Sequence, residues 1–364
     1  MNAHARLETD RTDATPAIRV MVVDDSLTIR TIFSRIVNAD PRLTVVGDAG
    51  TAEKALMKLK MAPVDVIMLD LEMPGMGGLE ALPKMLEACP EAQILVISAL
   101  TDEGAEHTIS ALSMGAADTM LKPMPGKFDE DYKRALIEKI FALGGVQPAE
   151  GIAAKQSAPP QQAKSSEQRK SGKILAIGAS TGGIHSMNVV LGGLERDFTA
   201  PILITQHLPS SFMAVFARQI AVASGRHTVV ADHDIELAAN TIYIAPGQAH
   251  LTVRRRGNRY VTALDYAPSR SGCTPSVDPM LHSLADATDG HATALILSGM
   301  GRDGIYGATH LFESGGTILA QDKESSAVWG MPRAVAEAGL AKIVATPERL
   351  AEEIALTMDA SAWR

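Results

Sequence analysis

The first 143 residues alternate between two hydrophobic patterns. Short apolar runs rich in β-branched residues exchange with segments whose apolar residues recur every three to four positions. The first pattern is typical of buried strands and the second of amphipathic helices. The expected strands cover 20–23, 43–46, 64–69, 94–97 and 119–121. The expected helices cover 28–37, 52–60, 78–88, 103–114 and 128–143. This alternation predicts a doubly wound parallel sheet.

The same alternation returns in the second half of the chain. The clearest expected strands cover 174–177, 201–206, 241–245, 292–297 and 317–321. The expected helices include 184–191, 276–287, 333–339 and 347–358. Residues 248–254 and 259–264 are predicted to pair as a hairpin around Gly257 and Asn258. We therefore expect a second α/β domain with a mainly parallel sheet.

Between the two patterned halves lies a segment without periodicity. Residues 144–172 are rich in Gln, Ser, Ala, Pro and Lys and have no strong apolar face. This composition is typical of a flexible tether. The predicted organisation is a domain at 17–143, a linker at 144–172 and a domain at 173–364.

Composition narrows the class of protein. The chain has 364 residues, 46% of them hydrophobic, which suffices for two cores. Its formal net charge is −8 and it lacks a basic block, so nucleic acid is not an expected partner. Cys89 and Cys273 match no metal-binding spacing, which favours free thiols in a reducing cytoplasm. Residues 1–16 are polar and no apolar run reaches 18 residues, so we expect a cytoplasmic protein that is not inserted in the membrane.

Polar residues stand where the strands of the first half end. They are Asp24, Asp25, Asp70, Ser98 and Lys122. Carboxyl ends of parallel strands share one edge, where ligands bind. Three carboxylates there repel one another unless a hard cation such as Mg²⁺ lies between them. A lysine and a hydroxyl can hold a phosphoryl group. Any one of these residues alone is more often a helix cap or a loop end.

Taken together, these motifs resemble a two-component receiver domain. The matching stretches are DDS at 24–26, DLEMPGMGGLE at 70–80, ISA at 97–99 and KP at 122–123. The resemblance implies a flavodoxin-like sheet in which Asp70 takes a phosphoryl group from a histidine kinase. It implies Mg²⁺ ligation by Asp24, Asp25, Asp70 and the Glu72 backbone carbonyl, and phosphoryl sensing by Ser98 and Lys122. Thr119 stands where many receivers carry an aromatic switch residue, so an aromatic flip is not expected.

The second half opens on KILAIGASTGG at 173–183. Ser180 follows an apolar run, precedes a helical pattern and has Gly178 and Gly182 two residues to either side. This matches the G-x-S-x-G turn that lifts a nucleophilic serine clear of a sheet. The helix behind it offers free N–H groups to an oxyanion. A phosphate or nucleotide loop and a plain tight turn are the alternatives, although neither Gly-Lys-Ser/Thr nor G-x-G-x-x-G is present.

Two further residues are expected on the same sheet edge. His207 follows the strand at 201–206, and Asp303 follows the strand at 292–297. A serine hydroxyl needs a base, an imidazole suits neutral pH, and a carboxylate can orient the ring. The order Ser–His–Asp differs from the Ser–Asp–His order of α/β-hydrolases. For Asp303 the alternative is an ordinary helix N-cap.

The second half resembles the catalytic domain of the chemotaxis protein-glutamate methylesterases, the CheB family. The matching stretches are GASTGG at 178–183, QHLP at 206–209, APG at 245–247, SVDP at 276–279, SGMGRDG at 298–304 and GGTILAQD at 315–322. The resemblance implies hydrolysis of glutamate γ-methyl esters on methyl-accepting chemoreceptors, with release of methanol, and deamidation of receptor glutamines. No cofactor is expected for ester hydrolysis.

The same resemblance assigns roles. Ser180 would be the nucleophile, His207 the base and Asp303 the residue that orients it, and backbone N–H groups near Thr181 and Met300 are oxyanion candidates. A chemotaxis histidine kinase would supply the phosphoryl group, and the unphosphorylated receiver is expected to cover the Ser180 edge. The alternatives for the second domain are a phosphate-binding domain and a DNA-binding domain. The second half is acidic to neutral and rich in strands, which disfavours DNA binding.

Overall fold

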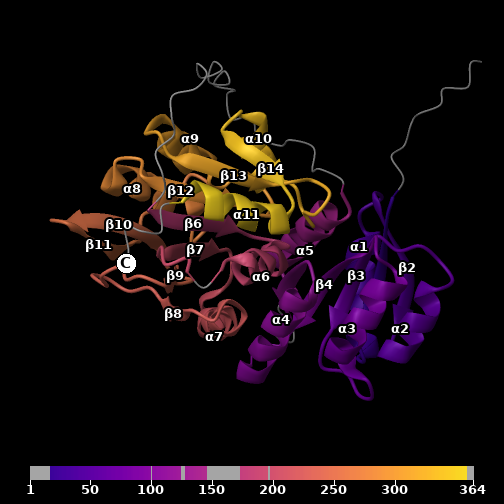
Figure 1. Ribbon diagram of the computed structural model, residues 1–364. Helices are drawn as coiled ribbons and strands as arrows, with labels where there is room; N and C mark the ends of the chain where they lie inside the picture. The colour runs from indigo at the N-terminus through magenta and orange to yellow at the C-terminus, as the bar shows by residue number, and fades with distance from the viewer. Residues whose placement is uncertain (1–16, 100, 124–127, 146–172, 196, 359–364) are drawn as a thin grey trace, which may run out of the picture.

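Two parallel sheets, each flanked by helices, make up the protein (Figure 1). The computed structural model describes residues 17–99, 101–123, 128–145, 173–195 and 197–358. Most of the predicted linker, 146–172, lies outside the described residues. The predicted fold class, two doubly wound parallel-sheet domains, is confirmed.

The first sheet has five parallel strands in the order β2-β1-β3-β4-β5. Their bounds are β1 Ile18–Val23, β2 Leu43–Ala49, β3 Val66–Asp70, β4 Gln93–Ser98 and β5 Asp118–Leu121. The helices are α1 Leu27–Asn38, α2 Ala52–Leu59, α3 Gly77–Ala88, α4 Asp102–Met114 and α5 Glu130–Leu143. The strand order is that of flavodoxin-like sheets.

The second sheet has seven parallel strands in the order β14-β13-β12-β6-β7-β9-β8. Their bounds are β6 Ile174–Ala179, β7 Ile202–Gln206, β8 His227–Val230, β9 Thr241–Ile244, β12 Ala292–Ile296, β13 Thr317–Gln321 and β14 Ala341–Ala345. The helices are α6 Gly183–Gly193, the 3₁₀ turn η1 Ser210–Phe212, α7 Met213–Ser224, α8 Val277–Thr288, α9 Ile305–Glu313, α10 Met331–Glu337 and α11 Pro347–Thr357. Strands β10 His250–Arg256 and β11 Arg259–Asp265 form the predicted antiparallel hairpin.

Both faces of the central strands of each sheet are buried, which explains why these strands have continuous apolar sequences. In β6, Leu175 and Ile177 belong to one core, while Ile174 and Ala176 belong to another. The first of these cores also contains β1 residues such as Met21, so one hydrophobic cluster runs through both domains.

Strand β6 sits at the point where the chain reverses its direction across the second sheet. It pairs with β7 on one side and with β12, which comes more than a hundred residues later, on the other. Ligands of open α/β sheets bind at such switch points, beyond the carboxyl ends of the strands. The loops after β12, β6 and β7 therefore meet where a site is expected.

Two strands, β8 and β14, are absent from the sequence prediction. Both lie at the edges of the second sheet, and β14 has the half-exposed burial of an edge strand. Edge strands need no continuous apolar run, so their signal in the sequence is weak.

Gly178 on β6 allows helix α8 to approach the sheet. A Cβ atom at Gly178 would lie 2.6 Å from a methyl group of Val277, the first residue of α8. Gly178→Val should therefore force α8 outward and lower the free energy of unfolding by ~1–3 kcal/mol. Chemical denaturation followed by circular dichroism measures this change.

Gly192→Ala on α6 is the control, since nothing lies within 4 Å of a Cβ there. It should leave stability unchanged or raise it by up to about 1 kcal/mol. Equal stability of the two variants would contradict the packing argument.

Candidate active site

Three side chains meet at the switch point of the second sheet. Ser180 follows the last residue of β6, and His207 follows the last residue of β7. Asp303 lies in the loop between β12 and α9. The structure thus brings the three residues predicted from the sequence to one edge.

Asp303 is the most enclosed of the three, with 3% of its surface exposed. Its Oδ1 accepts a hydrogen bond from the Ser276 hydroxyl at 2.6 Å. Its Oδ2 accepts one from the Val277 N–H at 2.7 Å and lies 2.8 Å from His207 Nε2. The N-cap of α9 is Gly304, so the helix-cap alternative for Asp303 is wrong.

The contact between Asp303 and His207 shifts the pKa of both side chains. Burial by itself disfavours the charged carboxylate, but the hydrogen bond and charge of His207 and the Ser276 and Val277 donors hold the pKa of Asp303 below its usual value. Burial also opposes the imidazolium, yet Asp303 raises the pKa of His207 above its ordinary value. Because Nε2 faces Asp303, Nδ1 is the nitrogen left to receive a proton from a nucleophile.

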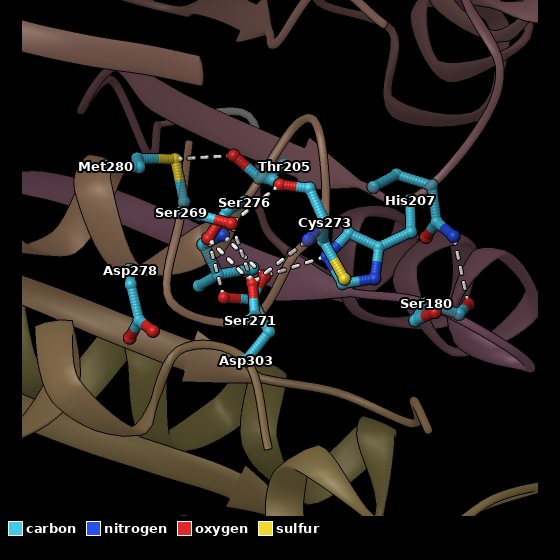
Figure 2. Close-up of polar contacts among 12 residues, drawn as sticks. Ser180, Thr205, His207, Ser269, Ser271, Cys273, Ser276, Asp278, Met280 and Asp303 are labelled. Atoms are coloured by element: carbon cyan, nitrogen blue, oxygen red, sulfur yellow. Dashed lines mark hydrogen bonds and ion pairs between the residues drawn. The ribbon is translucent and has the colours of Figure 1, made fainter. Parts of the chain in front are cut away.

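Cys273 is a neighbour of this pair that sequence reasoning missed. Its Sγ and ligand atoms of His207 and Asp303 lie within 4.8 Å of one another. Figure 2 shows the three side chains together. Cys273 and Ser276 lie in the loop before α8, and the sequence of this loop has no hydrophobic periodicity that would indicate a site. The SVDP motif at 276–279 is the one sequence signal for this loop.

The Ser180 backbone is fixed by the neighbouring strands. Its N–H donates to the Ser298 carbonyl at 3.0 Å, and its carbonyl accepts from Gln206 Nε2 at 2.9 Å. Within the described residues its hydroxyl makes no hydrogen bond, which leaves it available. Gly182, two residues on, is left-handed with φ 76°, and a Cβ there would collide with Ser298 and Ala327.

Two backbone N–H groups beside Ser180 are also available as hydrogen-bond donors. In the described part of the chain, neither Thr181 N–H nor Met300 N–H donates a hydrogen bond. Gly299 packs against the serine, since a Cβ there would lie 2.9 Å from Ser180 Cβ. The loop that carries Met300 therefore lies directly beside the hydroxyl.

The first sheet gathers its own polar cluster. Carboxylate oxygens of Asp24, Asp25 and Asp70 lie within 4.8 Å of one another. Lys122 Nζ lies 2.6 Å from Asp70 Oδ2 and 3.1 Å from Asp24 Oδ2. Burial, with the charge of Asp24, raises the pKa of Asp70 to about 6 despite Lys122. The buried Ser98 hydroxyl has no hydrogen-bond partner among the residues that the structure describes. Together these oxygen and nitrogen groups fit Mg²⁺ and a phosphoryl group.

Comparisons with known proteins cover both halves. A family model for the response regulator receiver domain matches residues 20–130, and one for the CheB methylesterase matches 175–354. A protein-glutamate methylesterase/protein-glutamine glutaminase of Maricaulis maris is 38% identical over 89% of this chain and 91% of its own length. A protein of that name from Caulobacter vibrioides is 39% identical over 93% of this chain and 98% of its own length.

The chain belongs to this family. The crystal structure of the Thermotoga maritima CheB methylesterase catalytic domain is 35% identical, covers 50% of this chain and 97% of its own length, and has a TM-score of 0.49. The resemblance inferred from the motifs is confirmed by the two long relatives. The domain boundaries at 143 and 173 stay predictions. Among the described residues, no helix has both the length and the apolarity to cross a membrane.

The receiver domain contacts the methylesterase domain directly at the serine corner, the turn of residues 180–182 after β6. Asp118 Oδ2, on β5, accepts a hydrogen bond from the Thr181 hydroxyl at 2.5 Å and lies 2.5 Å from Lys139 Nζ. The Ala117 carbonyl accepts the Gly182 N–H at 2.5 Å. The two residues after Ser180 are thus both bonded to the receiver.

Helix α4 extends this contact along α6 and α7. Glu106 pairs with Arg218 at 2.8 Å, and Ser113 accepts from Gln219 at 2.7 Å. Next to the contact, a cavity of about 540 Å³ opens between the domains. Lys122 of the receiver cluster and His207 of the methylesterase domain both line it.

Replacing Asp303 by Asn should move the titration of His207. Without the carboxylate, the pKa of His207 falls toward the ordinary value of about 6.5, and NMR titration of the imidazole measures it. The surface histidine His227 serves as the internal control. An unchanged His207 titration would contradict the pairing.

The same variant should change how stability depends on pH. Because folding raises the pKa of His207, the stabilisation from the pair is complete below about pH 6.5. It is lost as pH rises through the raised pKa of the folded protein. The difference in unfolding free energy between wild type and Asp303→Asn should therefore be largest near pH 6 and should narrow in alkali.

Proposed function

We propose that this chain hydrolyses glutamate γ-methyl esters on chemoreceptors, releasing methanol, and deamidates receptor glutamines, under control of receiver phosphorylation. The observation that carries the proposal is the His207–Asp303 pair beside Ser180 at the switch-point edge. The long relatives named as protein-glutamate methylesterase/protein-glutamine glutaminase support it. The protein would act in the cytoplasm on receptors embedded in the membrane.

In the proposed reaction, the Ser180 oxygen attacks the ester carbonyl. His207 Nδ1 takes the serine proton and Asp303 stabilises the imidazolium through Nε2. The tetrahedral intermediate collapses, and methanol leaves with the proton from His207. A water molecule, activated by the same nitrogen, then cleaves the acyl-enzyme to glutamate. With a glutamine substrate, ammonia takes the place of methanol.

The uncommitted N–H groups of Thr181 and Met300 support an oxyanion role. Both lie on segments that touch the Ser180 corner, where negative charge develops on the carbonyl oxygen. One such donor contributes roughly 10²–10³-fold in rate in other enzymes. The proton accepted by Nδ1 requires neutral His207, so the raised pKa favours higher activity at alkaline pH.

For the receiver, we propose that Asp70 accepts a phosphoryl group from a chemotaxis histidine kinase. Asp24, Asp25, Asp70 and the Glu72 carbonyl would hold Mg²⁺, whose charge offsets that of the phosphoryl oxygens. The Glu72 N–H donates to Asp70 Oδ1 at 3.1 Å, which keeps this segment folded over the carboxylate. Lys122 and Ser98 would contact the phosphoryl group.

The regulatory part of the proposal is occlusion. Asp118 and Ala117 hold the Thr181–Gly182 turn, so a receptor helix cannot approach Ser180 while the receiver is docked. Lys122, which contacts Asp70, directly follows β5, and Asp118 is the first residue of that strand. Phosphorylation changes the charge that Lys122 faces and shifts the docking equilibrium toward release.

Methanol release from methyl-labelled chemoreceptor membranes tests the function. Release should rise when Mg²⁺ and a small phosphodonor are added. Ser180→Ala should lower it by roughly 10⁴-fold or more, because the attacking atom is missing. Asp70→Asn should keep basal release and lose the stimulation. Release that persists in Ser180→Ala would contradict the esterase assignment.

Removing the Asp118 carboxylate tests occlusion. Asp118→Ala should raise methanol release without phosphodonor by roughly fivefold or more, because the undocked state gains population. Glu130→Ala is the matched control, since this exposed receiver carboxylate pairs with Lys133 of its own helix. Deleting residues 1–143 should raise release at least as much. Basal release no higher than that of the control would count against occlusion.

A further inference from the structure

A cluster of metal-ligating side chains lies outside both sites already described. It is formed by His282 and Asp286, one turn apart on α8, and by His310 on the neighbouring helix α9. We propose that these three residues bind a divalent transition-metal ion of the zinc class. This site goes beyond the proposed esterase function and uses none of its residues.

The geometry already gathers the ligands around one point. His310 Nε2 lies 2.7 Å from Asp286 Oδ1, and His282 Nδ1 lies 3.5 Å from Asp286 Oδ2. The two imidazole rings stack with centroids 4.0 Å apart and an interplanar angle of 13°. All three ligand atoms lie within 4.8 Å of one another. An ion at their centre therefore needs side-chain adjustments and no movement of the helices.

The donor set selects the class of ion. Two imidazole nitrogens and one carboxylate oxygen suit Zn²⁺, Ni²⁺ or Cu²⁺, whereas Mg²⁺ prefers oxygen ligands. Three protein ligands leave coordination positions to water, so the ion would be exchangeable. The nitrogens that face Asp286 must carry no proton when they bind the ion, and a neutral imidazole meets this condition by holding its proton on the other ring nitrogen.

The cluster is open to solvent. The side chains of His282, Asp286 and His310 are 59%, 61% and 34% exposed. His282 therefore faces solvent, although its neighbours in the sequence are apolar. An ion can therefore reach the three ligands without opening the hydrophobic core.

The site joins two helices whose first residues lie close to Asp303, in space for α8 and in sequence for α9. The first N–H of α8, that of Val277, donates to Asp303, and α9 begins two residues after Asp303. A metal bridge between α8 and α9 would stabilise the fold around that carboxylate. Because the ion binds the folded chain, the melting temperature should rise with metal concentration.

Two other groups in the described residues could compete for metal, and they differ in chemistry. The receiver carboxylates offer oxygen alone and can be filled with excess Mg²⁺. The group of His207, Cys273 and Asp303 contains a thiol, which gives bound Co²⁺ a sulfur charge-transfer absorption. The proposed site contains no sulfur, so its Co²⁺ spectrum lacks that band.

The test is calorimetric titration of the full-length protein with Zn²⁺ in excess Mg²⁺, together with Co²⁺ absorption spectra. A Cys273→Ser background removes the thiol group. We expect one site in that background, with no sulfur band. His282→Ala and His310→Ala should each weaken Zn²⁺ binding by roughly tenfold or more and abolish the zinc-dependent rise in melting temperature.

His227→Ala is the matched control, because this exposed histidine lies on β8 outside the cluster. It should bind Zn²⁺ as the background protein does. Equal Zn²⁺ affinity in His282→Ala, His310→Ala and His227→Ala would overturn the proposal. So would the absence of saturable Zn²⁺ binding in the Cys273→Ser background.

Discussion

The buried carboxylate of Asp303 is the interaction on which the methylesterase domain depends. A charge with 3% exposure is tolerated only when donors surround it. Here the donors come from three separate parts of the fold: the end of β7 through His207, the start of α8 through Val277, and the preceding loop through Ser276. Satisfying one carboxylate therefore fixes the relative positions of these three segments.

The carboxylate also links catalysis to packing. Helix α8 can place its first N–H against Asp303 because Gly178 on β6 leaves room for Val277. The neighbouring Gly182 turns the chain in a left-handed conformation so that Ser180 stands at the corner. Gly178, which leaves room for α8, and Gly182, which turns the backbone, thus both help to position Ser180 and Asp303.

How much of this can be predicted from the sequence differs from residue to residue. Ser180 and His207 follow apolar runs directly, so finding the strand also finds the residue. Asp303 lies seven residues after β12, so the strand end locates it less directly and the SGMGRDG motif is the stronger signal. Cys273 lies in the loop before α8, and Asp118 contacts Thr181 from the other domain. Hydrophobic periodicity predicts neither a loop conformation nor a contact between domains. The edge strands β8 and β14 are missed because a strand with one protected side needs fewer apolar residues.

Asp118 and Thr181 belong to one chain, so their contact is intramolecular. The predicted linker at 144–172 would make the receiver an internal ligand, whose effective concentration near Ser180 is on the order of millimolar. Dilution of the enzyme leaves that concentration unchanged. In the proposed regulation, the chemical state of the receiver and the length of the tether would therefore govern docking, and the number of copies of the protein in the cell would not.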